Sequence, residues 1–155
     1  MRRKDKEIRD IKEMNEIIRK TVFCNVAMSR NNIPYIVPMN FGFHEQCIFL
    51  HSANEGLKID ILKENPLVCI EIIPDAQLVK SKDQCNSSMK YRSVLISGKV
   101  EFLSAELDKK KALGYIVQHY DKNIKEDELD LSNYNFDRLI VLKVKIEKVT
   151  GKKSG

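Results

Sequence analysis

At 155 residues, with 43% apolar and 32% charged side chains and a formal net charge of +5, the chain has the composition of one globular domain spanning residues 1–155. This composition excludes disordered and fibrous proteins, and a chain of this length can bury a core. Charges interrupt every apolar run before it reaches the roughly 20 residues that cross a bilayer, so we expect no membrane partner.

The charges and cysteines narrow the class of protein further. Lys and Arg are interleaved with Asp and Glu along most of the chain, and no aromatic platform accompanies the basic runs, so we expect no nucleic-acid partner. The basic start is not followed by an apolar run, which predicts a cytoplasmic protein without a signal peptide. The cysteines are widely separated and form neither a zinc nor a redox motif, as expected for reduced thiols: Cys24, Cys47, Cys69 and Cys85.

The first part of the chain changes from a helical to an alternating pattern. Apolar residues recur at helical spacing over residues 4–20, which predicts an amphipathic helix. A strand over 22–28 then reaches a turn at 29–32, where two asparagines tolerate the positive φ of a tight hairpin. Residues 34–43 form the second arm of this hairpin, with apolar side chains at alternate positions.

Two prolines on the other face of this arm, Pro34 and Pro38, cannot donate ladder hydrogen bonds. We therefore expect an edge strand, or a bulged strand whose backbone meets something other than a neighbouring strand. A ligand is one candidate.

The rest of the chain adds four strands and two helices. We expect strands over 47–51, 67–73, 91–102 and 140–147, with a bend at Gly98. Helices are expected from Ser52–Glu55 to Asn65 and over 105–120. The remaining segments are a loop over 75–89, an irregular connection over 121–133 and a mobile tail over 150–155. Six strands with hairpin-like connections favour a mainly β fold, an antiparallel barrel with helices outside it. No GxGxxG motif follows a strand, which argues against a dinucleotide-binding fold.

The segment from His51 to Lys58 carries the clearest candidate site. A strand delivers His51 and Ser52 to the start of a helix, where free backbone N–H groups, the Ser52 hydroxyl and the charge of Lys58 favour an anion such as phosphate. The alternative is that Ser52 or Asn54 caps the helix while Lys58 points to solvent. His51 itself either contacts a cofactor or is a structural histidine of the sheet.

Other polar residues give weaker signals. Arg92 and Ser93 open a strand and could present polar groups to a ligand at the mouth of the barrel, or could be exposed strand residues. His44 and His119 have no partner at metal-ligand spacing, so we expect no metal site. No Gly-Xaa-Ser-Xaa-Gly elbow occurs, which leaves nucleophilic hydrolysis without visible apparatus.

Several segments, taken together, are similar in order and spacing to a known family. They are Met1-Arg2-Arg3-Lys4-Asp5, the strand from Pro34 to Gly42, His51-Ser52-Ala53 with Gly56 and Lys58, Tyr91-Arg92-Ser93-Val94 with Gly98-Lys99, and Thr150-Gly151-Lys152. In these motifs the chain resembles the 5-nitroimidazole resistance (Nim) branch of the pyridoxamine-phosphate-oxidase-like proteins. One departure is Leu57-Lys58, where relatives typically have Arg-Lys.

The resemblance implies a six-stranded antiparallel split β-barrel that forms a homodimer with FMN, or FAD, at the subunit interface. By position, the backbone of Val37, Pro38, Met39 and Asn40 would run along the flavin ring. His51 and Ser52 would lie near the ring and the ribityl phosphate, Lys58 would bind the phosphate, and Arg92 or Ser93 would add polar contacts.

The function that the resemblance implies is an FMN-dependent reductase of a small molecule such as a 5-nitroimidazole, with His51 as the candidate catalytic residue. The flavin would carry out the redox chemistry. The alternative is a non-catalytic protein that holds flavin or haem for sensing or storage.

Overall fold

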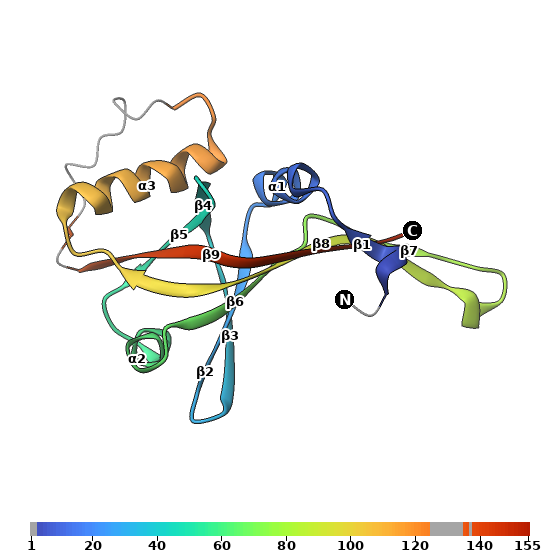
Figure 1. The fold of residues 1–155 in the computed structure, drawn as a ribbon, viewed down its shortest axis with the longest axis horizontal. Coiled ribbons are helices and arrows are strands. Elements are labelled where there is room, and N and C mark those ends of the chain that lie inside the picture. The colour runs from blue at the N-terminus through green and yellow to red at the C-terminus, as the bar shows by residue number, and fades with distance from the viewer. Residues whose placement is uncertain (1–2, 125–134, 137) are drawn as a thin grey trace.

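The computed structural model describes residues 3–124, 135–136 and 138–155. These residues form a nine-stranded antiparallel sheet and three α-helices, arranged around a long pair of strands, β8 and β9 (Figure 1). The helices are α1 (Ile11–Lys20), α2 (Leu57–Glu64) and α3 (Glu106–Tyr120). The strands are β1 (Glu7–Ile8), β2 (Cys24–Arg30), β3 (Ile33–Met39), β4 (Phe41–His44), β5 (Cys47–Ala53), β6 (Leu67–Ile72), β7 (Ala76–Val79), β8 (Ser88–Phe102) and β9 (Leu139–Ser154).

The sheet has the order β3-β2-β6-β8-β9-β5-β4, with β1 on β9 and β7 on β8. The predicted hairpin joins β2 to β3, and both turn residues, Asn31 and Asn32, have positive φ. Only Asn40 separates β3 from β4, so the two edges of the sheet are consecutive in the chain. Within the described residues these edges are not hydrogen-bonded into a closed cylinder.

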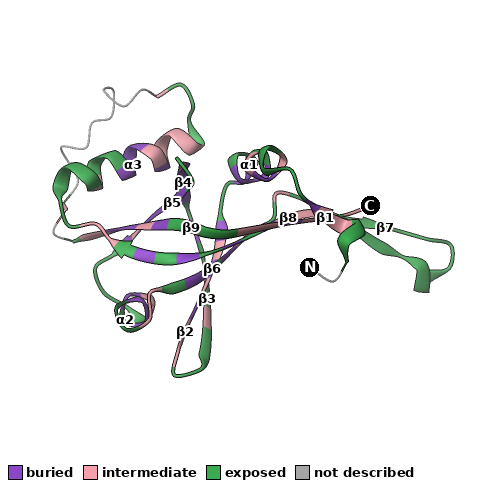
Figure 2. Cartoon of the chain, in the orientation of Figure 1, coloured by how far each residue is buried: buried purple, intermediate pink, exposed green. Residues whose placement is uncertain are grey.

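Two apolar clusters hold the chain together. The larger fills the concave interior of the sheet, because strands such as β8 alternate buried and exposed positions (Figure 2). The smaller lies between α3 and the outer side of β5 and β9, where it buries Val141 completely. The fold is therefore mainly β with helices outside, as the sequence predicts.

Three predicted boundaries are wrong because the segments concerned pair with other strands. Helix α1 begins at Ile11 instead of at residue 4, because Glu7–Ile8 pairs with β9 and Asp10 accepts a hydrogen bond from the N–H of Lys12 at 2.8 Å. The expected loop 75–89 contains β7, which pairs with β8, and the expected mobile tail continues β9. The first and last of these segments pair with residues far away in the sequence, whereas β7 forms a hairpin with the start of β8 inside the predicted loop. The expected connection 121–133 lies mostly outside the described residues.

The predicted bend at Gly98 is a break in the pairing of β8 with β9. Ser97 pairs with Lys148 but Gly98 pairs with Ile146, so β9 carries one extra residue there. A side chain at Gly98 would place its Cβ 2.4 Å from the carbonyl oxygen of Lys145, which explains the glycine. Within the described part of the chain, no helix is long and apolar enough to cross a membrane.

Candidate functional site

The junction of β5 and α2 brings His51 and Lys58 together. His51 is half-buried on β5, and Lys58 lies in the first turn of α2. Burial lowers the pKa of His51, and the positive charge of Lys58 lowers it further. The charged form of His51 is therefore disfavoured both by burial and by the charge of Lys58.

The start of α2 has no cap from its own N-cap residue. That residue is Gly56, with φ of 112°, which has no side chain, and the Ser52 hydroxyl bonds no described residue, so Ser52 does not cap the helix. The first N–H groups of a helix have no partner within it, and the helix dipole adds positive potential there. Strand β5 extends to Ala53, two residues beyond the predicted end at His51, so Ser52 lies in the sheet instead of at the helix start.

Ser52 is the second sign of a ligand at this junction. It is 6% exposed, and its hydroxyl oxygen is buried without a hydrogen-bond partner among the described residues. An unpaired buried polar group costs about 1–3 kcal/mol, which a ligand oxygen or N–H reaching it would recover. Ser52 is therefore a candidate hydrogen-bond partner for a ligand, on the sheet face opposite to His51 because successive strand side chains alternate.

Residues 37–40 end beside the same junction. Strand β3 is an edge that pairs only with β2, which explains how two prolines are tolerated. Along it, Val37 is half-buried, Met39 is buried and Pro38 and Asn40 are exposed. Phe41 pairs with Leu50, which places position 40 across from position 51.

Arg92 and Ser93 lie elsewhere. Arg92 pairs across β8 and β9 with Lys153, and its guanidinium contacts the exposed Asp75 carboxylate at 3.2 Å. It lines a pocket of about 400 Å³ beside β7 and the end of β9. Strand β7 and helix α2 lie at opposite ends of the β8–β9 pair (Figure 1).

The distance between the two groups follows from strand register. His51 pairs with position 141 of β9 and Arg92 with position 153, which at about 3.3 Å per residue is roughly 40 Å. One chain therefore brings position 40 and Lys58 near His51, and it does not bring Arg92 or Ser93 to them.

Sequence reasoning missed Tyr120, the last residue of α3. Its hydroxyl donates to the carbonyl of Val22 at 2.6 Å and accepts from the N–H of Phe41 at 3.1 Å, so it fastens the break between β3 and β4. A tyrosine on an otherwise apolar helix stripe was the available signal, because a partly buried hydroxyl needs a partner. In the described residues, no three His, Cys, Asp or Glu side chains converge as metal ligands.

A rolled antiparallel sheet with an anion-ready strand-to-helix junction is the architecture of split-barrel proteins. Residues 10–153 match the family model of pyridoxamine 5′-phosphate oxidase. The chain therefore belongs to the pyridoxamine 5′-phosphate oxidase family. No match was found among curated proteins.

Solved structures agree with this assignment. A candidate 5-nitroimidazole antibiotic resistance protein from Bacteroides thetaiotaomicron is 33% identical, with a TM-score of 0.79 over 94% of this chain and 85% of that one. The FAD and haem binding protein from Mycobacterium smegmatis is 19% identical, with a TM-score of 0.85 over 96% and 73%. A flavocytochrome from Azotobacter vinelandii is also 19% identical, with a TM-score of 0.81 over 100% and 72%. At 19% identity, the Mycobacterium smegmatis and Azotobacter vinelandii proteins show only that they share the fold of this chain.

Proposed function

We propose that the protein is a homodimeric FMN-dependent reductase of a small molecule, such as a 5-nitroimidazole or another nitroaromatic. The observation that carries the proposal is the junction of β5 and α2, where the buried Ser52 hydroxyl has no hydrogen-bond partner among the described residues and Lys58 lies in the first turn of the helix. A flavin phosphate suits these donors. The 33% identity to the Bacteroides thetaiotaomicron protein supports the substrate class.

The flavin, when bound, supplies the electron transfer, and the chain supplies binding and proton chemistry. Lys58 and Ser52 would hold the phosphate, and the backbone of 37–40 would run along the ring. His51, which is half-buried and near Lys58, would be the side chain that gives or takes a proton. FMN is proposed over FAD because Lys58 offers one phosphate-binding charge at an eight-residue helix.

The dimer is part of the proposal because the predicted binding residues do not meet in one chain. If Arg92 and Ser93 belong to the flavin site, they must come from the partner, since they lie roughly 40 Å from His51 along β9. The outer face of the sheet also leaves apolar side chains uncovered in a single chain, including Ile36 at 59% and Leu67 at 58% exposed. A cytoplasmic location is proposed with it, since all four cysteines are free.

A spectrum of the purified protein, followed by release and identification of the bound compound, tests the cofactor. Turnover of a 5-nitroimidazole with reduced nicotinamide then tests the activity. A strong haem band instead of a flavin spectrum would favour the alternative of a haem-holding protein, to which the two more distant structures give some support.

A mixing experiment tests the shared site. Lys58→Ala and Arg92→Ala should each lose flavin. A heterodimer of the two variants has one site in which both residues are replaced and one site in which Lys58 and Arg92 are both intact. It should therefore regain flavin in half of its sites. Heterodimers that regain nothing would contradict a site built from both protomers.

A further inference from the structure

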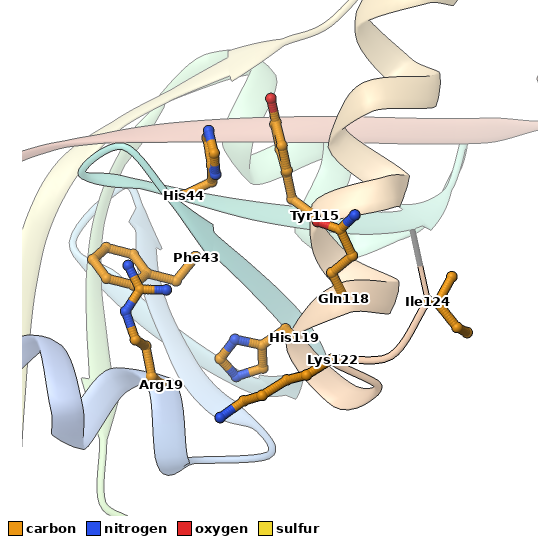
Figure 3. Close-up of a pocket in the computed structure, with 8 residues that line it drawn as sticks. All are labelled: Arg19, Phe43, His44, Tyr115, Gln118, His119, Lys122 and Ile124. Carbon is orange, nitrogen blue, oxygen red and sulfur yellow. The ribbon is translucent and has the colours of Figure 1, made fainter. Parts of the chain in front are cut away.

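A second pocket lies between the end of α1, strand β4 and helix α3, away from the β5–α2 junction. It has a volume of about 550 Å³, in the range of pockets that take metabolite-sized ligands. Figure 3 shows the side chains that line it: Arg19, Phe43, His44, Tyr115, Gln118, His119, Lys122 and Ile124. None of them belongs to the candidate flavin site.

Close packing of α3 on β4 builds one wall of this pocket. A Cβ on Gly42 would lie 2.7 Å from backbone atoms of Tyr115 and Ile116, so only glycine lets the helix approach this far. The approach lays the ring of Tyr115 on that of His44, with centroids 4.0 Å apart and planes at 5°. The stack forms a flat, partly polar surface.

The pocket contains two positively charged side chains, Arg19 and Lys122. The Arg19 guanidinium lies 5.0 Å above the Phe43 ring, and neither Arg19 nor Lys122 makes an ion pair with any described residue. No acidic residue is among the described residues that line the pocket. An anion entering here would meet two cations that no carboxylate of the described residues neutralises.

His119 is affected by the positive charges of Arg19 and Lys122. Its Nε2 lies 2.8 Å from the carbonyl oxygen of Thr21, which can only accept, so this nitrogen carries the proton. The pKa of His119 is lowered, and burial is the largest cause. The hydrogen bond to Thr21 raises this pKa, whereas the positive charges of Arg19 and Lys122 lower it further. The charges of Arg19 and Lys122 therefore both act on the imidazole of His119.

The two kinds of group lie at different ends. In Figure 3 the stacked rings of His44 and Tyr115 are at one end, and Arg19, His119 and Lys122 surround the other. We propose that this pocket binds a small planar organic anion, with its ring near His44 and Tyr115 and its negative group at Arg19 and Lys122. A nucleoside monophosphate and an aromatic carboxylate share this chemistry.

The test is calorimetric titration of the full chain, saturated with FMN, using AMP and salicylate as separate probes. Saturable binding of either supports the pocket, and the probe that binds distinguishes phosphate from carboxylate. Adenosine, which keeps the ring and loses the charge, should bind at least about tenfold more weakly than AMP, as expected for a charge-assisted contact.

Three variants assign the binding to this pocket. Arg19→Gln and Lys122→Gln should each weaken the bound probe by about tenfold, whereas Lys12→Gln, which removes the same charge from the first turn of α1, should not. Thermal midpoints establish that each variant is folded. Equal weakening by Lys12→Gln, or no saturable binding of either probe, would overturn the proposal.

Lys58→Ala separates this proposal from that of the flavin site. It should remove flavin while AMP binding is retained. Loss of AMP binding in Lys58→Ala, with Arg19→Gln unaffected, would place the probe at the β5–α2 junction and overturn the second pocket.

Discussion

The hydroxyl oxygen of Tyr120 accepts a hydrogen bond from the backbone N–H of Phe41, directly after the segment 37–40 that is proposed to follow the flavin ring. The same hydroxyl donates to the carbonyl of Val22. The end of α3 thus satisfies a backbone group at the break between the two edge strands. The position of the proposed ring-binding backbone depends on a helix that contributes nothing else to that site.

Tyr120→Phe should lower both stability and flavin retention. It leaves the Phe41 N–H without its partner, and because Tyr120 is 43% exposed we expect a loss of about 1 kcal/mol in the free energy of unfolding. Denaturant unfolding and flavin titration measure the two effects. Tyr35→Phe, on β3, is the matched control, since the Tyr35 hydroxyl bonds no described residue; equal losses in both variants would refute the positioning role.

Lys58→Ala should weaken FMN binding far more than riboflavin binding. The lost contact is with the phosphate, and a charge-assisted hydrogen bond contributes about 1.5–3 kcal/mol. Fluorescence titration of both flavins gives the comparison, with Lys63→Ala in the last turn of α2 as the control. If the two flavins weaken equally, Lys58 acts through the fold instead.

His51→Asn should reduce turnover more than stability. The side chain lies beside Lys58 at the proposed phosphate site, so a flavin bound there passes close to it. Flavin content, thermal midpoint and nitroreductase rate are measured on the same preparation. An unchanged rate per bound flavin would show that His51 is a structural residue of the strand.

Ile36→Glu should convert the proposed dimer to a folded monomer. Ile36 is 59% exposed on the edge strand, where a charge would be buried if two copies pack together. Sedimentation at micromolar concentration reports the mass. Leu107→Glu, at a 64% exposed position of α3, should leave the mass unchanged. A wild-type chain that is monomeric with flavin bound would end the dimer proposal.

Stability should fall as the pH drops below neutral. Burial lowers the folded-state pKa of His51 and of His119 below 6.5, so the unfolded chain binds more protons in this range. The free energy of unfolding is therefore highest above pH 6.5 and declines as pH falls toward the folded-state pKa values. His119→Gln should make the decline shallower in denaturant unfolding measured across this range; an identical slope would exclude a contribution from His119.

Local pattern was sufficient for the parts of the fold whose signal lies within one element. Alternation over 91–102 predicts most of strand β8, and Gly98 its irregularity, because side-chain direction in a strand has period two. The short strand β1 could not be found in this way, since Ile8 pairs with Gly151. Asn40 also gives no sign that the arm 34–43 is divided.

The same distinction applies to the site. His51, Ser52 and Lys58 are close in sequence, so a strand followed by a helix was enough to place them together. The separation of Arg92 from them depends on the register of β8 against β9 and of β9 against β5. The register between strands that are distant in sequence is set by tertiary packing, so the pattern of one segment alone does not predict it.

The extra residue in β9 changes which alternate side chains of the strand face the interior of the sheet. Leu142 and Val144 face the barrel interior on one side of the break, whereas Val149 and Gly151 do so on the other. Deleting Glu147 would restore a single alternation, carry Lys152 inward and turn Gly151 away from Ile8 and Met14, against which it packs. A substitution of the exposed Glu147 changes one surface group, but its deletion would exchange the two faces of every residue that follows.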